Sequence, residues 1–153
     1  MIEYSQEKVS TLWGEVMPLL EAHWDEIAHY KDILVDPDTA LYEMVEEAGA
    51  LRCYTARADG RLIGYLVFFV KHNGHYKSSL QAVQDVLFLL PEYRKGGVGV
   101  RLLKWAEEML IAENVQVVYH HVKTTNQVGK LLVHLGYELV DEIYAKRLDK
   151  GVE

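Results

Sequence analysis

The chain has 153 residues, of which 50% are hydrophobic and 25% charged, and its formal net charge is −7. This length suits one compact core, so we expect a single domain over residues 1–153. The acidic balance argues against a nucleic-acid partner, which needs basic side chains to neutralise phosphates. The sequence has no apolar run near the ~20 residues of a membrane span, no secretion signal and one cysteine, Cys53. These features argue against a membrane partner and favour a cytoplasmic protein.

The N-terminal third predicts helices. Pro18 lies inside the first helical pattern and should kink that helix or start a second one, because proline lacks an amide donor. A turn at 36–39 precedes a short helix over 40–47, with Gly49 just past its end. The apolar face of the first helix recurs at three- and four-residue spacing through Val9, Leu12, Val16, Leu19, Leu20, His23, Trp24 and Ile27.

Strand patterns begin near residue 51. Asp59-Gly60, between two apolar runs, is a strong hairpin signal, and Pro91 ends a later strand. The order of the elements predicts an α/β fold, in which a mixed sheet of an antiparallel meander plus a parallel crossover strand is flanked by helices. We expect strands over 52–58, 61–71, 80–90, 115–122 and in one or two segments of 137–148, and helices over 97–113 and 126–135.

A glycine-rich turn follows the strand that ends at Pro91. The first amides of the helix after it have no intrahelical partner, and the helix dipole favours an anion there. Glycines let a phosphate approach the backbone, and Arg94 and Lys95 add positive charge. A pyrophosphate ligand is therefore a sound hypothesis, although an ordinary strand–helix turn is the alternative. The spacing fits neither the Walker A loop nor Gly-x-Gly-x-x-Gly.

The residues around this turn resemble the central motif of the GNAT N-acetyltransferase superfamily, Arg/Gln-x-x-Gly-x-Gly/Ala. Arg94, Gly97 and Gly99 stand at its fixed positions. The resemblance extends over about 52–148 and looks closest to the short members encoded by bacteriophages and prophages. The first strand of the family has one candidate segment here, Ile2-Glu3-Tyr4.

The resemblance implies a binding site for acetyl-coenzyme A. The strand before the turn would pair with the pantetheine arm, and one of its amides would face the thioester carbonyl as an oxyanion donor. Asn126 and Lys130 would hold the far side of the cofactor. The strand residues are Leu87, Phe88 and Leu89, and the turn residues are Arg94, Lys95, Gly96, Gly97, Val98, Gly99 and Val100.

The resemblance also implies direct transfer of the acetyl group to an amine, which needs a general base and an acid for the departing thiolate. Asp85 is our candidate for the base, because a carboxylate is unusual in an apolar strand. The alternative is a solvent-facing or salt-bridged aspartate. Many members carry a tyrosine as the acid where this chain has Leu132 or Val133, so His121 is our candidate for the acid.

The acceptor is a small-molecule, peptide or protein amine whose identity the sequence does not specify. His72, His75 and Tyr76 precede the Asp85 strand and are predicted to line its site, while Glu43 and Glu46 lie on solvated helix faces or border it. No metal site is expected, because the histidine spacing matches no zinc pattern. A homodimer is compatible with the resemblance. The alternative function is a catalytically silent coenzyme A-binding sensor or interaction module.

Overall fold

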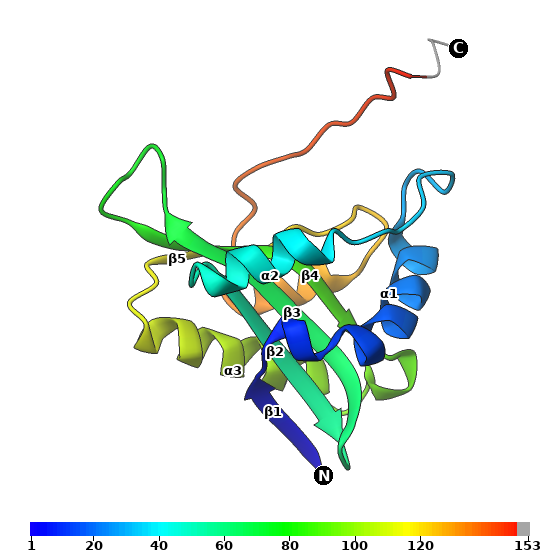
Figure 1. Cartoon of the computed structure of the whole chain (residues 1–153). Coiled ribbons are helices and arrows are strands. Elements are labelled where there is room, and N and C mark those ends of the chain that lie inside the picture. Colours follow the sequence, from blue (N-terminus) through cyan, green and yellow to red (C-terminus); the bar gives the residue numbers. More distant parts are fainter. Residues whose placement is uncertain (150–153) are drawn as a thin grey trace. The chain divides into compact units, whose positions relative to one another are not determined.

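The computed structural model describes residues 1–149, and within them five strands form one sheet in the order β1–β2–β3–β4–β5 (Figure 1). The pairs β1–β2, β2–β3 and β3–β4 are antiparallel, and the pair β4–β5 is parallel. The predicted mixed sheet is therefore confirmed. The elements are β1 (Ile2–Gln6), the 3-10 helix η1 (Val9–Thr11), α1 (Trp13–Ile27), α2 (Thr39–Glu47), β2 (Leu51–Ala58), β3 (Arg61–His72), β4 (Leu80–Leu89), the 3-10 helix η2 (Pro91–Tyr93), α3 (Val98–Ala112), β5 (Val117–Tyr119) and α4 (Val128–His134).

The chain forms two compact units, Met1–His121 and Val122–Glu153. The first unit contains the whole sheet with α1, α2 and α3, and the second contains α4. The expectation of a single domain stays a prediction. Among residues 1–149, none of the helices has the length and apolar character needed to cross a membrane.

Several predicted boundaries were wrong. Pro18 lies inside α1, so no second helix begins there, and the alternative of a kink at Pro18 stays a prediction. The strand predicted over 115–122 is formed only at Val117–Tyr119, and the segment 137–148 contains no strand. The apolar alternation of that segment meets no ladder partner in the described chain, and a strand is defined by its partner as well as by its side chains.

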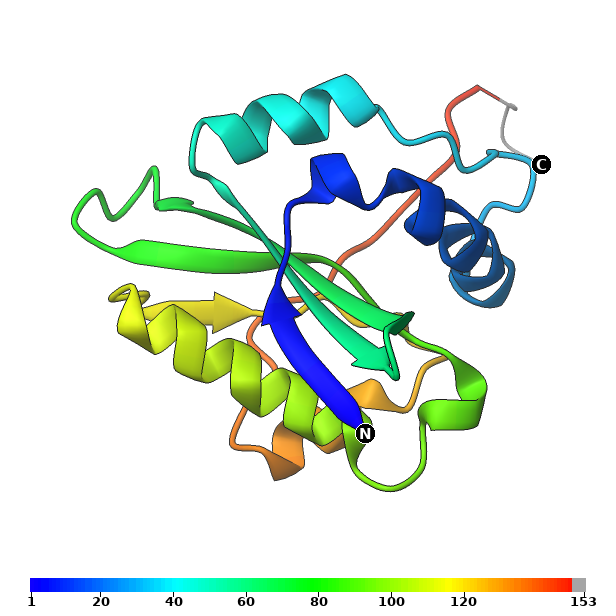
Figure 2. The same cartoon turned by 60° about the horizontal axis from the view of Figure 1, so that its bottom comes forward.

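Helices cover both faces of the sheet in the first unit, with α1 and α2 on one face and α3 on the other (Figure 2). On the α3 face, the Tyr54 ring packs edge-on against Trp105 of α3, with ring centroids 5.4 Å apart. The buried stripe of α3 follows the helical spacing that its sequence predicts. Each fully buried leucine contributes roughly 1.5–3 kcal/mol to folding. The stripe comprises Val98, Leu102, Leu103, Ala106 and Leu110.

Acidic side chains of α2 attach this helix to the start of α1. Glu46 accepts hydrogen bonds from the backbone amides of Val9 at 2.6 Å and Ser10 at 3.4 Å. Glu43 accepts one from the indole nitrogen of Trp13 at 3.2 Å. A carboxylate on the unsatisfied amides at a helix start is a charge-assisted cap, which fixes α2 relative to η1 and α1.

A second carboxylate cluster holds α1 on the end of β2. Arg57 of β2 pairs with Glu7 at 2.9 Å and with Glu15 of α1 at 2.8 Å. Thr55 donates a short hydrogen bond to Glu7. The Arg57 guanidinium is the main reason that the pKa values of both glutamates are lowered. This cluster and the contacts of Glu46 thus both fix the start of η1 and α1.

His23 of α1 gives the first unit a pH-dependent stability. This side chain is buried against Tyr65 and Phe88, and its burial lowers its pKa from 6.5 to about 4. Because the unfolded chain binds the proton more tightly, the stabilisation is present above pH 6.5 and is lost as the pH falls toward 4. At roughly 1.4 kcal/mol per pKa unit, the loss amounts to about 3 kcal/mol.

Urea unfolding at about pH 7.5 and about pH 5 measures this loss. We expect His23→Gln to reduce the difference between the two pH values, and His29→Gln, at an exposed position, to leave it unchanged. A His23→Gln variant with the full wild-type difference would contradict the assignment.

Candidate functional site

A β-bulge at Asp85 shapes the centre of β4. Val67 of β3 pairs with Val86 and Phe68 pairs with Gln84, so Asp85 is the extra residue between two ladder pairs. A bulge interrupts the alternation of side chains and re-aims one of them. As a result, Asp85 and Val86 both line the pocket on the α1–α2 face, although they are consecutive residues.

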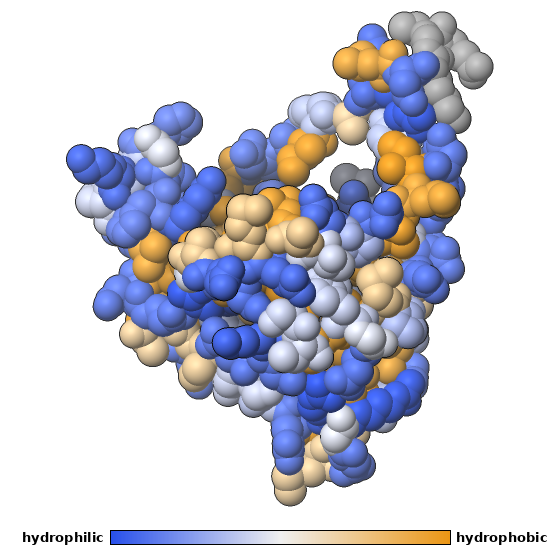
Figure 3. Space-filling model, viewed as in Figure 1, coloured by the Kyte–Doolittle hydropathy of each residue, from blue (hydrophilic) through white to orange (hydrophobic). Residues whose placement is uncertain are grey.

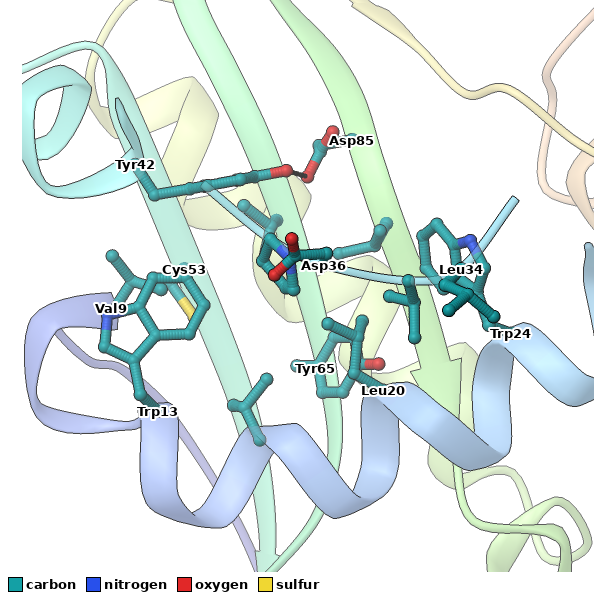
Figure 4. A pocket seen from close by; sticks show the side chains of 15 residues that line it. Val9, Trp13, Leu20, Trp24, Leu34, Asp36, Tyr42, Cys53, Tyr65 and Asp85 are labelled. Atoms are coloured by element: carbon teal, nitrogen blue, oxygen red, sulfur yellow. Dashed lines mark hydrogen bonds between the residues drawn. The ribbon is translucent and has the colours of Figure 1, made fainter. Parts of the chain in front are cut away.

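The Asp85 carboxylate has a specific partner in Tyr42 of α2. The Tyr42 hydroxyl donates a hydrogen bond of 2.6 Å to Asp85 Oδ2 (Figure 4). Partial burial raises the pKa of Asp85, and the hydrogen bond from Tyr42 opposes this rise. Burial, followed by the bond to Asp85, also raises the pKa of Tyr42, so the phenol keeps its proton. The structure therefore supports the reading of Asp85 as a half-buried, hydrogen-bonded carboxylate instead of a salt-bridged one.

A pocket of about 230 Å³ lies beside this pair. Its walls come from α1, the segment 34–37, α2 and strands β2 to β4. Figure 3 shows apolar surface along the segment between α1 and α2, where Leu34 is 82% exposed. The lining is mainly aromatic and aliphatic and includes Trp13, Val16, Leu20, Trp24, Leu34, Tyr65 and Val67.

Cys53 of β2 also lines the pocket. Burial raises the pKa of its thiol to about 12. The thiolate is the nucleophilic form of cysteine, so at neutral pH this side chain is a weak nucleophile. The pocket is accordingly suited to chemistry that proceeds without a covalent bond to the protein.

The edge of β4 beyond the bulge is free of its neighbour β5. The parallel ladder joins only Gln81–Val83 of β4 to Val117–Tyr119 of β5, while β4 continues to Leu89. Past the ladder, Gln84 spans the gap with its side chain: its Nε2 donates to the His121 carbonyl at 3.2 Å, and its Oε1 lies 2.6 Å from His120 Nδ1. A side-chain bridge holds the two segments farther apart than a backbone ladder does, so backbone groups of β4 are left for another partner.

The glycine-rich turn connects β4 to α3. Gly96 and Gly97 have φ values of 82° and 79°, in the left-handed region that favours glycine, and Gly97 is the N-cap of α3. The turn is exposed, and the Arg101 side chain stabilises it by donating a hydrogen bond to the Gly96 carbonyl at 3.1 Å. The first amides of a 15-residue helix, which have no intrahelical partner, begin directly after this exposed turn.

Arg94, the arginine of the motif, makes contacts within the protein. Its Nε donates to the Leu89 carbonyl at 2.8 Å, and its Nη2 pairs with Glu26 of α1 at 2.9 Å. Its guanidinium also lies 5.5 Å from the centre of the Phe88 ring. Arg94 thus holds the end of β4 against α1, and its role toward the cofactor stays a prediction.

The predicted acceptor residues lie outside the Asp85 pocket. His72 pairs with Leu80 at the opposite end of β4, five positions before Asp85, and strands rise about 3.3 Å per residue. His72 instead lines a shallow depression with Glu113 and Gln116, and His75 and Tyr76 are exposed on the β3–β4 loop. The structure does not bring these three side chains together with Asp85.

The remaining predicted residues fall at the end of the first unit and in the second. His121 is exposed just after β5, on the segment that Gln84 bridges to β4. Asn126 accepts a hydrogen bond from the Val128 amide at 2.8 Å before α4, and Lys130 is exposed on α4. Leu132, at a position where many family members carry tyrosine, is buried.

Tyr42, Trp13, Trp24 and Asp36 are site residues that the sequence interpretation missed. Trp24 lies on the predicted apolar face of α1, Trp13 lies on α1 outside that predicted face, and Tyr42 lies on α2. No spacing rule connects these helices to residue 85, because their approach depends on the caps from Glu43 and Glu46. Asp36 had a visible signal, since it stands in a turn motif, but turn chemistry alone explains an aspartate there.

β4 ends its ladder with its parallel neighbour β5 early, carries a carboxylate at a bulge opposite β3 and leads into a glycine turn, an arrangement that fits an acetyltransferase. Residues 16–137 match the acetyltransferase (GNAT) family, and the chain belongs to this family. Its cofactor is acetyl-coenzyme A. A search of curated proteins found no match.

Solved structures share the fold at low sequence identity. The ribosomal-protein-alanine N-acetyltransferase from Brucella melitensis biovar Abortus 2308 matches with a TM-score of 0.71 and 17% identity, covering 97% of this chain and 99% of its own. The aminoglycoside N-acetyltransferase AAC(6')-Iy, in complex with CoA, matches with 0.72 and 21%, covering 97% and 95%. A predicted acetyltransferase with acetyl-CoA from Clostridium acetobutylicum matches with 0.71 and 13%, covering all of both chains. None of these matches tests the resemblance to phage-encoded members.

The residues of the first unit fit this cofactor. A pyrophosphate needs unpaired amides and close backbone approach, which the exposed Gly96–Gly97 turn at the start of α3 offers. An extended pantetheine arm needs a strand edge with free hydrogen-bonding groups, which β4 offers beyond Val83. These features fit acetyl-coenzyme A, and its placement along β4 stays a prediction.

Gly97→Ala tests the turn. A Cβ at Gly97 would meet Arg101 Nη1 at 3.1 Å and would also force a left-handed alanine. We expect coenzyme A affinity to fall at least about tenfold, because the amides that face the pyrophosphate shift. Gly60→Ala is the matched control, since Gly60 has a similar φ of 86° in the β2–β3 hairpin and open space around it.

Both variants should lose a similar unfolding free energy of about 1–2 kcal/mol. Calorimetric titration with coenzyme A then separates the turn from general strain. Equal affinity in the two variants would place the cofactor elsewhere.

Proposed function

We propose that the protein transfers the acetyl group of acetyl-coenzyme A directly to an amine nitrogen. The observation that carries this proposal is the half-buried Asp85 carboxylate, which a β-bulge points into an apolar pocket next to the free edge of β4. A primary ammonium has a pKa near ~10 and must lose a proton before it can attack. Asp85 is the base that accepts this proton, directly or through water.

The chain's own residues hold and move the proton. Tyr42 keeps Asp85 in place and, through its hydrogen bond, opposes the rise in the pKa of Asp85 that burial causes. Bound acetyl-coenzyme A supplies the acetyl group and a thiol leaving group. Backbone amides on the free edge of β4, at Leu87, Phe88 or Leu89, donate to the acetyl carbonyl oxygen as negative charge develops there.

The other cofactor and acid assignments follow the family pattern. Amides of residues 95–100 hold the pyrophosphate, and Asn126 and Lys130 hold the far side of the cofactor. His121 donates the proton to the thiolate. This assignment is supported by the hydrogen bond from Gln84 to the His121 carbonyl, which holds the His121 backbone beside the free edge of β4. In this proposal the acceptor is a small-molecule amine, because a pocket of about 230 Å³ suits a ligand of that size. The protein is proposed to work in the cytoplasm.

A silent coenzyme A-binding sensor is the second candidate function. It is favoured by Leu132 and Val133 of α4, which stand where many family members carry the acidic tyrosine. Under this alternative the same turn and strand bind coenzyme A, and no amine is acetylated.

Asp85→Asn separates the two functions. We expect the variant to bind coenzyme A as the wild type does and to lose about 10²- to 10⁴-fold in kcat, because the amide cannot accept the ammonium proton. Thiol release over a panel of amines measures the turnover, with the exposed Asp59→Asn as control. Tight coenzyme A binding by the wild type without turnover on any amine would favour the sensor.

Tyr42→Phe tests the hydrogen bond to Asp85 through the pH profile. Removing the phenol removes the interaction that lowers the pKa of Asp85, so this pKa rises further. Because only the ionised carboxylate is a base, kcat/KM falls as the pH drops through this pKa. We expect the acidic limb of the profile to move to higher pH in Tyr42→Phe and to stay in place in Tyr144→Phe. An unmoved limb in Tyr42→Phe would mean that another group is the base.

A further inference from the structure

The charge of the Asp85 pocket is of one sign. Among the residues that line it, the charged side chains are Asp36 and Asp85, with no lysine, arginine or histidine. Tyr42 donates to one oxygen of Asp85, and no other donor within residues 1–149 contacts this carboxylate. A partly buried carboxylate with one neutral donor has an open place for a cation. The pocket therefore suits a ligand with one ammonium group.

The rest of the pocket offers little to a hydroxyl-rich ligand. The Tyr42 hydroxyl is directed at Asp85, and the Tyr65 hydroxyl lies 3.2 Å from His23 Nδ1 in the core. The indole of Trp13 donates to Glu43. Hydroxyl or amino groups on a polar ligand would lose their water and find few partners here, which is unfavourable.

Aromatic rings form the walls on three sides. Figure 4 shows Trp13 and Trp24 projecting from α1 and Tyr65 from the sheet, with Asp36 on the segment that crosses in front. Such rings pack against an apolar ligand ring and attract an ammonium through their π faces. An apolar cavity of about 150 Å³ holds one benzene ring, and drug-sized ligands occupy about 300–1,000 Å³. A volume of about 230 Å³ thus fits one ring with a short chain.

Resting on the proposed function, we infer that the acceptor is a compact arylalkyl monoamine. Its ammonium binds Asp85, and its ring lies between Tyr65 and Trp13, whose own ring packs 5.8 Å from that of Tyr42, the partner of Asp85. Asp36 adds negative charge that attracts the cation. In the reaction, the ammonium gives one proton to Asp85 and the amine nitrogen bonds to the acetyl carbon of acetyl-coenzyme A. The carbon–sulfur bond breaks, and coenzyme A leaves as a thiolate that takes up a proton. The products are an N-acetyl arylalkylamine and coenzyme A.

Calorimetric titration of the full chain with 2-phenylethylamine tests the ligand class without turnover. The neutral 2-phenylethanol has the same ring and chain without the charge, and spermidine, an aminoglycoside and a lysine-containing peptide represent the other amine classes. We expect 2-phenylethylamine to bind at least about tenfold more tightly than 2-phenylethanol, because of the charge at Asp85. Equal binding of these two compounds would overturn the inference.

Two tryptophan variants test the walls. Trp13→Leu should weaken 2-phenylethylamine binding about three- to thirtyfold, whereas Trp24→Leu, about 16 Å away along α1, should weaken it less. Trp105→Leu is the matched control, because Trp105 packs on the opposite face of the sheet and should leave this affinity unchanged. Equal weakening in all three variants would show a general effect on folding and would contradict the claim that the tryptophans contact the ligand. In that case the comparison of 2-phenylethylamine with 2-phenylethanol on the wild type still tests the ligand class, because it needs no variant.

Turnover with acetyl-coenzyme A distinguishes this inference from the proposed function. Preferred acetylation of 2-phenylethylamine supports both. Preferred acetylation of spermidine, the aminoglycoside or the peptide overturns the inference and keeps the proposed function. Tight binding of 2-phenylethylamine with no acetylation of any amine supports the ligand class and overturns the proposed function.

Discussion

The bulge at Asp85 is the constraint on which the site depends. One extra residue between the Val67–Val86 and Phe68–Gln84 pairs sends Asp85 to the α1–α2 face and keeps Gln84 on the α3 face. Gln84 then bridges β4 to His121 beyond the last pair of the β4–β5 ladder, and this bridge leaves the edge of β4 open. The candidate base, the pocket and the strand edge proposed for the cofactor therefore share one irregularity. A regular strand would have turned the side chains beyond this point to the other face.

The site also depends on the position of α2, which carries Tyr42. This helix has no fully buried residue, and its half-buried Tyr42 packs on Phe69 of β3, so polar contacts contribute to its position on the sheet. Glu46 caps η1 at the Val9 amide, and Glu43 binds the Trp13 indole. These contacts bring Tyr42 to Asp85, where the phenol replaces water as the partner of the carboxylate. A functional hydrogen bond in the pocket thus depends on carboxylates that lie outside it.

Direct transfer, in place of a covalent enzyme intermediate, agrees with the chemistry of the pocket. Cys53 lies within it, but burial raises the pKa of its thiol to about 12. Tyr42 is also held protonated, as a donor toward Asp85. Asp85 is left as the half-buried carboxylate of the pocket and stays the candidate base. Residues that resemble nucleophiles in the sequence thus act as walls or as donors, because of where the fold buries them.

The sequence by itself determined the mixed sheet, the glycine turn and the candidate base. Each of these depends on local rules: strand periodicity, left-handed glycines at Gly96 and Gly97, and a carboxylate in an apolar strand. Only the tertiary structure decided what surrounds Asp85. Tyr42, Trp13 and Trp24 reach the pocket from helices whose placement depends on long-range contacts. It also placed His72, His75 and Tyr76 elsewhere, because distance along a strand grows with each residue, so a neighbouring loop in sequence lies at the far end of β4.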